Sequence, residues 1–152
     1  MPQAGTVCWL GIRSERLAPM TIVDSVEIDI ANSIVGDRYS GKAGSKRQVT
    51  LVQQEHVDAI SNILGKPVDP QLLRRNIVVS GINLVALKER EFQIGTVVLL
   101  GTGNCHPCSR MEKNLGPGGY NAMRGHGGLT ASVVVSGVVK IGDTVKIFDE
   151  NT

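Results

Sequence analysis

Short apolar segments, rich in valine and isoleucine and separated by glycine and polar residues, make up most of this chain. In one of them Val26, Ile28 and Ile30 alternate with Glu27 and Asp29, which is the two-residue period of a strand with one buried face. Seven segments rich in apolar, mostly β-branched residues predict strands, at residues 5–10, 20–30, 49–52, 76–79, 96–100, 130–135 and 144–148. Such a chain buries its strands by packing a sheet on itself or by closing it.

Two stretches, 92–98 and 139–145, resemble each other and place a glycine between apolar residues, as the corner of a barrel or a hairpin does. Helical spacing is clear from Gln53 to Leu64, and Gly65-Lys66-Pro67 ends that segment. Two shorter helices are predicted, at residues 69–74 and 109–114. We therefore predict an α+β protein that is mainly β: a mostly antiparallel, closed or nearly closed β-barrel with a few short helices.

The overall composition bounds the class of protein. With 152 residues, 41% hydrophobic and 20% charged, the chain fits one globular domain over residues 1–152. A net charge of +2, with one Trp, two Tyr and two Phe, does not predict nucleic-acid binding. No apolar run approaches the ~20 residues that span a bilayer, and the N-terminus lacks a signal-peptide pattern. Three cysteines do not suggest a disulfide framework, so we expect a reduced, cytoplasmic protein without membrane association.

The residues best suited to chemistry gather in one loop, Gly103 to Glu112, which contains the sequence Cys105-His106-Pro107-Cys108. The loop follows the apolar run at 96–100 and precedes a glycine-rich segment at 116–128. A thiolate is both a nucleophile and a soft metal ligand, and a loop at the end of a strand can hold one toward solvent or a cofactor. We therefore predict that this loop is the functional centre.

Three interpretations of the paired cysteines follow from their spacing alone. A thioredoxin-type dithiol lies near the first strand of a βαβ pattern, whereas this motif comes two thirds of the way along a β-rich chain. A structural zinc site needs four ligands, and Cys105 and Cys108 have only His106 or His126 to add to them. The plainest interpretation is two partly buried cysteines in a tight, proline-containing turn.

Two basic segments indicate an anionic ligand near the cysteine loop. Arg74 and Arg75 precede Asn76 at the start of one apolar strand segment, and a glycine-rich loop at 36–48 carries basic side chains into another. Arginine binds phosphate through two parallel hydrogen bonds, and glycine-rich loops expose backbone N–H groups. These segments predict that an anionic cofactor lies beside a thiolate.

The histidines differ in their sequence surroundings. His106 and His126 lie in loops that contain glycine or proline, and both could titrate near neutral pH, so we consider them candidates for the site. His56 lies near the apolar face of the predicted helix, and we expect it to be structural.

Six motifs, in this order along the chain, resemble the MOSC domain, the C-terminal domain of molybdenum cofactor sulfurases. That family also includes the amidoxime-reducing molybdoenzymes and small stand-alone bacterial proteins, and the chain resembles a stand-alone bacterial-type member. The resemblance is strongest over residues 36–147. The motifs are Gly-Asp-Arg…Gly-Lys at 36–42, Arg-Arg-Asn-Ile-Val-Val at 74–79, Ile-Gly-Thr-Val-Val-Leu at 94–99, Cys-His-Pro-Cys at 105–108, Arg-Gly-His-Gly-Gly-Leu at 124–129 and Val-Lys-Ile-Gly-Asp-Thr-Val at 139–145.

The resemblance implies roles for particular residues. The family's signature cysteine corresponds to Cys108, which in amidoxime-reducing relatives is a molybdenum ligand, so Cys108 is the expected catalytic cysteine. His106 neighbours it in the loop and is a further expected cofactor contact. The residues that the resemblance places around the cofactor's phosphate and pterin are Arg74, Asn76, Lys46, Arg47, Gly127 and Gly128.

The resemblance further implies a protein that binds the molybdenum cofactor and reduces N-oxygenated small molecules by oxygen-atom transfer. Its electrons would come from a separate reductase, because the chain contains no flavin, haem or iron–sulfur motif. The alternative is a sulfur carrier that holds a persulfide on Cys108 and passes sulfur to a cofactor or metal–sulfur cluster on a partner protein. Pyridoxal phosphate is not expected, because the sequence shows no aminotransferase-like half.

Overall fold

The structure is a computed structural model, which describes residues 4–15, 18–37, 43–107 and 110–148. Its strands are β1 (Gly5–Ile12), β2 (Thr21–Ile22), β3 (Ser25–Asp29), β4 (Ser33–Ile34), β5 (Val49–Gln53), β6 (Ile77–Ser80), β7 (Glu91–Ile94), β8 (Val97–Asn104), β9 (Leu129–Val135), β10 (Gly137–Lys140) and β11 (Thr144–Ile147). Its helices are α1 (Gln54–Leu64), α2 (Arg110–Leu115) and α3 (Gly119–Met123), with two 3-10 turns, η1 (Pro70–Leu73) and η2 (Leu84–Leu87).

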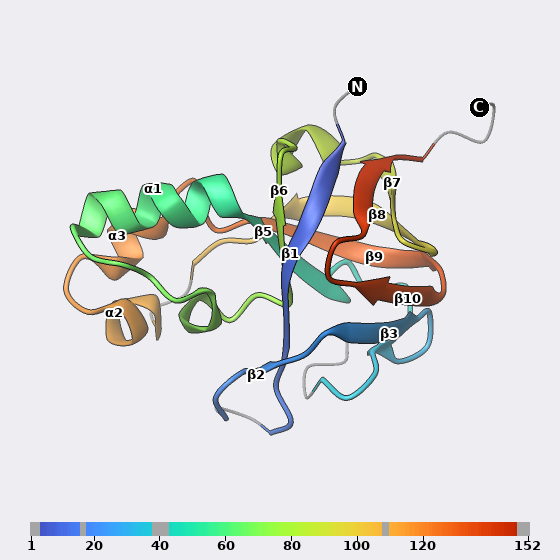
Figure 1. Cartoon of the computed structure of the whole chain (residues 1–152), viewed down its shortest axis with the longest axis horizontal. Helices are drawn as coiled ribbons and strands as arrows, with labels where there is room; N and C mark the ends of the chain where they lie inside the picture. Colours follow the sequence, from blue (N-terminus) through green and yellow to red (C-terminus); the bar gives the residue numbers. More distant parts are fainter. Residues whose placement is uncertain (1–3, 16–17, 38–42, 108–109, 149–152) are drawn as a thin grey trace.

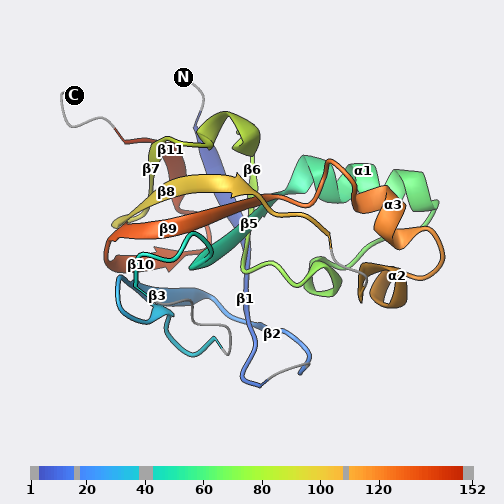
Figure 2. The same ribbon diagram turned by 180° about the vertical axis from the view of Figure 1, so that it is seen from behind.

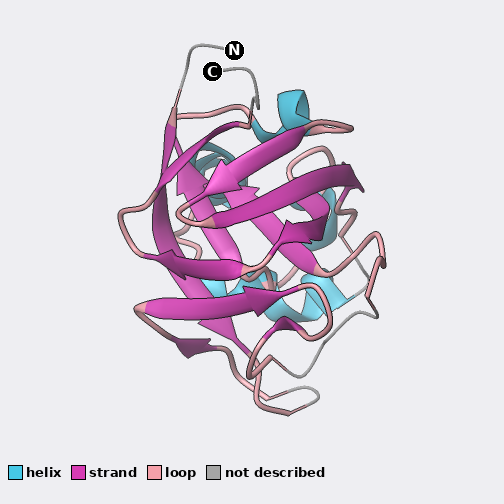
Figure 3. Cartoon of the chain, turned by 90° about the vertical axis from the view of Figure 1, so that its right-hand side faces the viewer, coloured by secondary structure: helices cyan, strands magenta, loops and turns pink. Residues whose placement is uncertain are grey.

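Seven of the described strands form a closed barrel, in the order β11-β7-β8-β9-β5-β6-β1. Figure 3 shows, in magenta, that strands make up most of the molecule. The barrel closes where β1 pairs with β11, with Gly5 opposite Val145 and Thr6 opposite Thr144. Strand β2 pairs antiparallel with the end of β1, with Gly11 opposite Ile22. Strands β10, β3 and β4 form a separate three-stranded sheet, and β10 and β3 lie below the barrel in Figure 1. The predicted mainly β, closed barrel with a few helices is therefore confirmed.

The prediction of a mostly antiparallel barrel needs a correction, because the barrel is mixed. Strands β5 and β6 run parallel, with Leu51 opposite Ile77. A parallel pair needs a long crossover, and α1 with η1 supplies it. Both strands are covered on two sides: Leu51 and Ile77 point into the barrel core, whereas Val52 and Val78 pack against the helices. Continuous apolar strands of this kind are typical of parallel pairs.

The three helices gather on one side of the barrel, as Figures 1 and 2 show from opposite directions. They share a second hydrophobic cluster, in which Val57 and Ile60 of α1 pack with Met111 of α2 and Met123 of α3. Helix α1 ends at Leu64, as the sequence predicts, and the backbone N–H of Gly65 donates to Ser61. Within the described residues, no helix combines the length and apolar character needed to cross a membrane.

The two glycine turns have different outcomes. The stretch 92–98 forms the hairpin of β7 and β8, whereas 139–145 is a corner where the chain leaves the three-stranded sheet and enters the barrel as β11. The predicted single strand at 20–30 is divided into β2 and β3. The helices lie beside one end of the barrel (Figure 2). The loop after β8 and the loop before β9, which contribute to the candidate site, lie at this end.

Candidate functional site

Arg75 holds the cysteine loop in place. Its side chain is 3% exposed, and its guanidinium reaches across from the start of β6 to two other loops. Nε donates to the carbonyl of Gly127 at 2.7 Å, and Nη2 donates to the carbonyls of Cys105 and His106 at 3.4 and 3.3 Å. Nη1 donates to Leu73 at 3.1 Å. One planar cation thereby ties the cysteine loop to the glycine-rich loop before β9.

The neighbouring Arg74 has a different environment. It ends η1 with a left-handed backbone (φ 62°), and its Nη1 donates to the carbonyl of Ala18 in the segment between β1 and β2. Burial, together with the nearby guanidinium groups of Arg13 and Arg110, lowers the pKa of Arg74 below its ordinary value, while Asp37 acts in the opposite direction. Arg13 and Arg110 therefore both lie within electrostatic range of Arg74, and we call Arg13, Arg74 and Arg110 the arginine cluster.

Asp37 is the acidic member of this region and is 8% exposed. Its Oδ1 accepts a hydrogen bond from the backbone N–H of Arg13 at 2.7 Å and lies 3.8 Å from Arg13 Nε. That Nε is buried and has no hydrogen-bond partner among the described residues. Counted over the described residues alone, Asp37 and the three guanidinium groups leave a net positive charge, and a buried donor such as Arg13 Nε is one that an anionic oxygen can satisfy.

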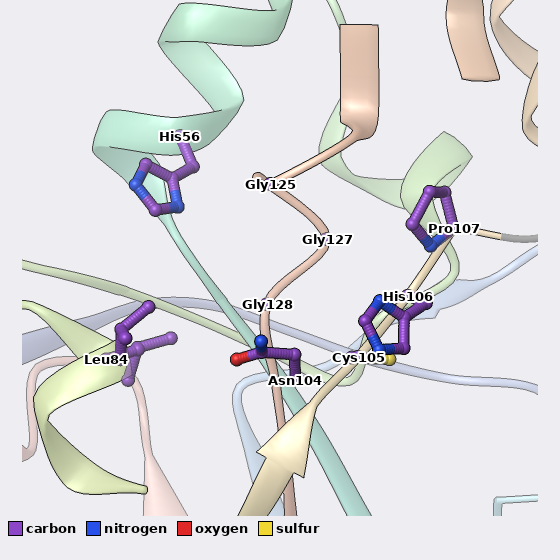
Figure 4. Close-up of a pocket in the computed structure, with 10 residues that line it drawn as sticks. His56, Leu84, Asn104, Cys105, His106, Pro107, Gly125, Gly127 and Gly128 are labelled. Atoms are coloured by element: carbon purple, nitrogen blue, oxygen red, sulfur yellow. The ribbon is translucent and has the colours of Figure 1, made fainter. Parts of the chain in front are cut away.

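A pocket of about 120 Å³ lies on the other side of the cysteine loop, toward α1 and η2 (Figure 4). Cys105, His106 and Pro107 form one wall, and the glycine segment from Gly125 to Gly128 forms another. Figure 4 shows His56 reaching in from α1, with Leu84 below it and Asn104 at the end of β8. The pocket therefore includes three residues predicted as cofactor contacts, His106, Gly127 and Gly128.

Gly127 and Gly128 owe their identity to close backbone packing. A Cβ atom on Gly127 would overlap the carbonyl oxygen of Cys105, and one on Gly128 would overlap that of Leu51. Gly128 also has φ 102°, which side-chain-bearing residues rarely adopt. The Cys105 N–H donates to the Gly128 carbonyl at 2.8 Å, so these glycines fix the cysteine loop against β5.

His56, which lines the pocket, forms a pair with His126. Their ring centroids are 5.0 Å apart in an edge-to-face arrangement, and Nδ1 of His126 lies 3.1 Å from the carbonyl of Ala122, to which it donates. Burial, then the neighbouring His126, lowers the pKa of His56, and Glu55 opposes this shift. The expectation that His56 is structural missed its place at the pocket, because the other residues that line the pocket come from distant parts of the chain.

We expect acid to destabilise the fold through His56. Because its pKa is lowered in the folded protein, the unfolded chain takes up a proton more readily, near the ordinary value of about 6.5. Its contribution to stability is complete above that value and decreases as the pH falls through and below it. Urea unfolding between pH 7.5 and 5.5 should show a smaller loss of stability in His56→Gln than in the wild type. His126→Gln should also reduce the loss of stability. If the free energy of unfolding decreases with pH in both variants as steeply as in the wild type, the prediction is contradicted.

The other predicted cofactor contacts have separate places. Asn76 is 4% exposed and joins three strands: its Oδ1 accepts from Thr50 Oγ1 at 3.0 Å, and its Nδ2 donates to Gly11 at 3.1 Å. Lys46 and Arg47 are exposed on the loop before β5, where the Lys46 carbonyl accepts from Thr102 Oγ1. Neither lines the pocket. A ligand contact by these three residues stays a prediction.

The two cysteines of the motif differ in what the structure tells about them. Cys105 is 2% exposed, which disfavours a dithiol mechanism that needs both sulfur atoms accessible. Cys108 lies outside the described residues. Among residues 4–15, 18–37, 43–107 and 110–148, no group of three His, Cys, Asp or Glu side chains is placed to hold a metal ion. The zinc interpretation therefore gains no support from the described part of the chain.

The structure is thus a small, mixed β-barrel with a cysteine-containing loop next to a group of arginines. The family model of the MOSC domain matches residues 38–146, and this chain belongs to the MOSC domain family. A comparison with curated protein sequences gives no match.

Solved structures share the whole fold. The YuaD protein from Bacillus subtilis superposes with a TM-score of 0.80 at 22% identity, over 96% of this chain and 97% of that one. YiiM from Geobacillus stearothermophilus gives 0.75 at 14% identity, over 95% of this chain and 75% of that one. YiiM from Escherichia coli gives 0.70 at 15% identity, over 95% and 70%. At these identities the similarity establishes the fold.

Proposed function

We propose that this MOSC domain binds the molybdenum cofactor, with the cofactor's phosphate at the arginine cluster and the thiolate of Cys108 as a metal ligand. The observation that carries the proposal is the cluster itself: three guanidinium groups, one carboxylate, and a buried Arg13 Nε without a hydrogen-bond partner among the described residues. A phosphate supplies the charge and the acceptor oxygens that this arrangement lacks.

The chain order supports placing Cys108 at the same centre. Residues 105–107 line the pocket, and Arg110 belongs to the arginine cluster. Cys108 lies between these two features in the sequence. Arg75 fixes the loop on the pocket side through the carbonyls of Cys105 and His106, so the segment that carries Cys108 starts from a defined position.

The donor set fits such a cofactor. A thiolate is a soft ligand suited to a metal that already has sulfur ligands, and arginine recognises phosphate through paired hydrogen bonds. When bound, the cofactor supplies a metal that exchanges an oxygen atom and two electrons with a substrate. The residues of the chain hold the phosphate, orient the loop and shape the adjoining pocket. The proposed substrates are N-oxygenated small molecules, and the electrons come from a separate reductase.

The metal content of the purified protein tests this function. The protein is produced in a host that makes the molybdenum cofactor, and molybdenum and pterin are measured per chain. We expect near-stoichiometric values in the wild type and a loss of at least tenfold in Cys108→Ser. Cys105→Ser is the matched control, and it should retain the cofactor because the buried Cys105 is held through its backbone.

Two other results would replace the proposal. Metal-free wild-type protein with a cyanide-labile sulfur that disappears in Cys108→Ser would indicate the sulfur carrier. Equal loss of activity in Cys105→Ser and Cys108→Ser, without any bound metal, would indicate dithiol chemistry.

A further inference from the structure

We infer that the pocket beside the cysteine loop is a binding site for a compact, uncharged molecule that both donates and accepts hydrogen bonds. The inference rests on the proposed function in one respect: it takes the bound molecule to be the substrate that reacts at the cofactor held by Cys108. Binding itself needs only the described residues around the pocket.

The charge of the pocket argues for a neutral ligand. None of the described residues that line it is Asp, Glu, Lys or Arg. The buried cation Arg75 does not line the pocket, and it donates to the carbonyls of Cys105, His106 and Gly127. His56 is held toward its neutral form by burial and by His126. A charged ligand would therefore lose its hydration without gaining an opposite charge in the pocket.

The size of the pocket argues for a compact ligand. Its volume of about 120 Å³ is below the ~150 Å³ of a closed cavity that accepts a benzene ring, so the group that enters this solvent-open pocket is compact. Leu84, Val85 and Pro107 give it an apolar side, and Leu84 is itself buried. A molecule with one methyl-sized apolar part and one planar polar group matches a pocket that has both apolar and polar lining residues.

The hydrogen-bonding groups of the pocket are of mixed kind. A neutral imidazole offers one donor and one acceptor, and the amide of Asn104 offers both as well. Figure 4 shows His56 and Asn104 on different sides of the space in front of the glycine segment. A planar group with one N–H and one oxygen or nitrogen acceptor offers a complementary partner to each of these side chains.

Three molecules of one shape test the inference. Acetamide, acetate and acetamidinium are nearly isosteric and differ in charge, and benzamide adds bulk. Each is titrated into full-length protein produced without cofactor at pH 7.5, and backbone NMR shifts are followed at Gly125, Gly127 and Gly128. Acetamide should bind with a dissociation constant of about 1–10 mM, as expected for so few atoms. Acetate, acetamidinium and benzamide should each bind at least tenfold more weakly.

Variants place the binding in this pocket. Val85 lines the pocket and is 51% exposed, so Val85→Trp fills the space without disturbing the core and should weaken acetamide binding at least tenfold. The matched control is Val138→Trp on β10, where Val138 is 39% exposed and outside the pocket, and it should bind as the wild type does. His56→Phe should also weaken binding, since it removes the donor and the acceptor while keeping a ring.

The inference is overturned if acetamide causes no saturable shift at these glycines, if either ion binds as tightly as acetamide, or if Val85→Trp binds it unchanged. Because these titrations use cofactor-free protein, they separate this inference from the proposed function. Acetamide binding in a protein that never acquires molybdenum would support the pocket and refute the cofactor.

Discussion

Replacing Arg75 by methionine should lower the free energy of unfolding by about 3–5 kcal/mol, because it removes several hydrogen bonds from a charged group, each of which contributes about 1.5–3 kcal/mol. Methionine keeps the unbranched stem but removes the donors to four carbonyls, those of Leu73, Cys105, His106 and Gly127. Buried carbonyls without partners cost roughly 1–3 kcal/mol each when they cannot relax toward water. Urea unfolding at neutral pH measures the change.

The control for this experiment is Arg90→Met, which changes the same side chain at an exposed position. It should alter the free energy of unfolding by no more than about 0.5 kcal/mol. Arg75→Lys should fall between the two, since lysine keeps the charge but lacks the planar fork that reaches several carbonyls at once. Equal stability of Arg75→Met and Arg90→Met would show that Arg75 does not hold the two loops together.

The barrel could be predicted from the sequence to a large extent. Segments rich in Val and Ile located most strands, and the glycine turn at 92–98 proved to be a hairpin. The parallel pair was missed because it depends on how the two segments around α1 are joined. Strand β5 (VTLVQ) is buried along its whole length, and β6 begins with the apolar run Ile77 to Val79. Two such segments separated by a helix are the pattern of a parallel pair with a helical crossover. Considering the runs together with the helix would have indicated a mixed barrel.

The candidate site was predicted less completely, because its groups come from distant parts of the chain. Arg13 lies just after β1 and Arg110 begins α2, and only the folded chain brings them near Arg74. Nothing in the local sequence distinguishes them from solvated charges. The pair Arg74 and Arg75 was visible as a motif, but not their different contacts: Arg74 donates to Ala18, whereas Arg75 donates to the cysteine loop and to Gly127. The left-handed backbone at Arg74 was not evident from the sequence either.

The glycines before β9 also show what the sequence alone could not predict. Gly127 and Gly128 were predicted as places where the backbone approaches a ligand. They do line the pocket, but the close approach that requires glycine is to the chain's own carbonyls, those of Cys105 and Leu51. A glycine-rich motif indicates a close approach, and the structure is needed to identify the partner.

Removing two charges from the arginine cluster should release the cofactor. Arg74→Gln combined with Arg110→Gln takes away two guanidinium groups and leaves the buried Arg75 intact. Hydrogen bonds to charged groups contribute about 1.5–3 kcal/mol each, so the loss of affinity should be at least a hundredfold. The matched control is Lys140→Gln with Lys146→Gln, two exposed cations on β10 and β11. Lys46→Gln with Arg47→Gln tests the other predicted contacts, and we expect a smaller loss there.

The most direct measurement is the amount of pterin and molybdenum that stays on each variant after purification from a host that makes the cofactor, determined by native mass spectrometry and metal analysis. The arginine cluster account predicts a loaded wild type, a loaded Lys140→Gln/Lys146→Gln protein and an empty, folded Arg74→Gln/Arg110→Gln protein. Full loading of the Arg74→Gln/Arg110→Gln protein would contradict it.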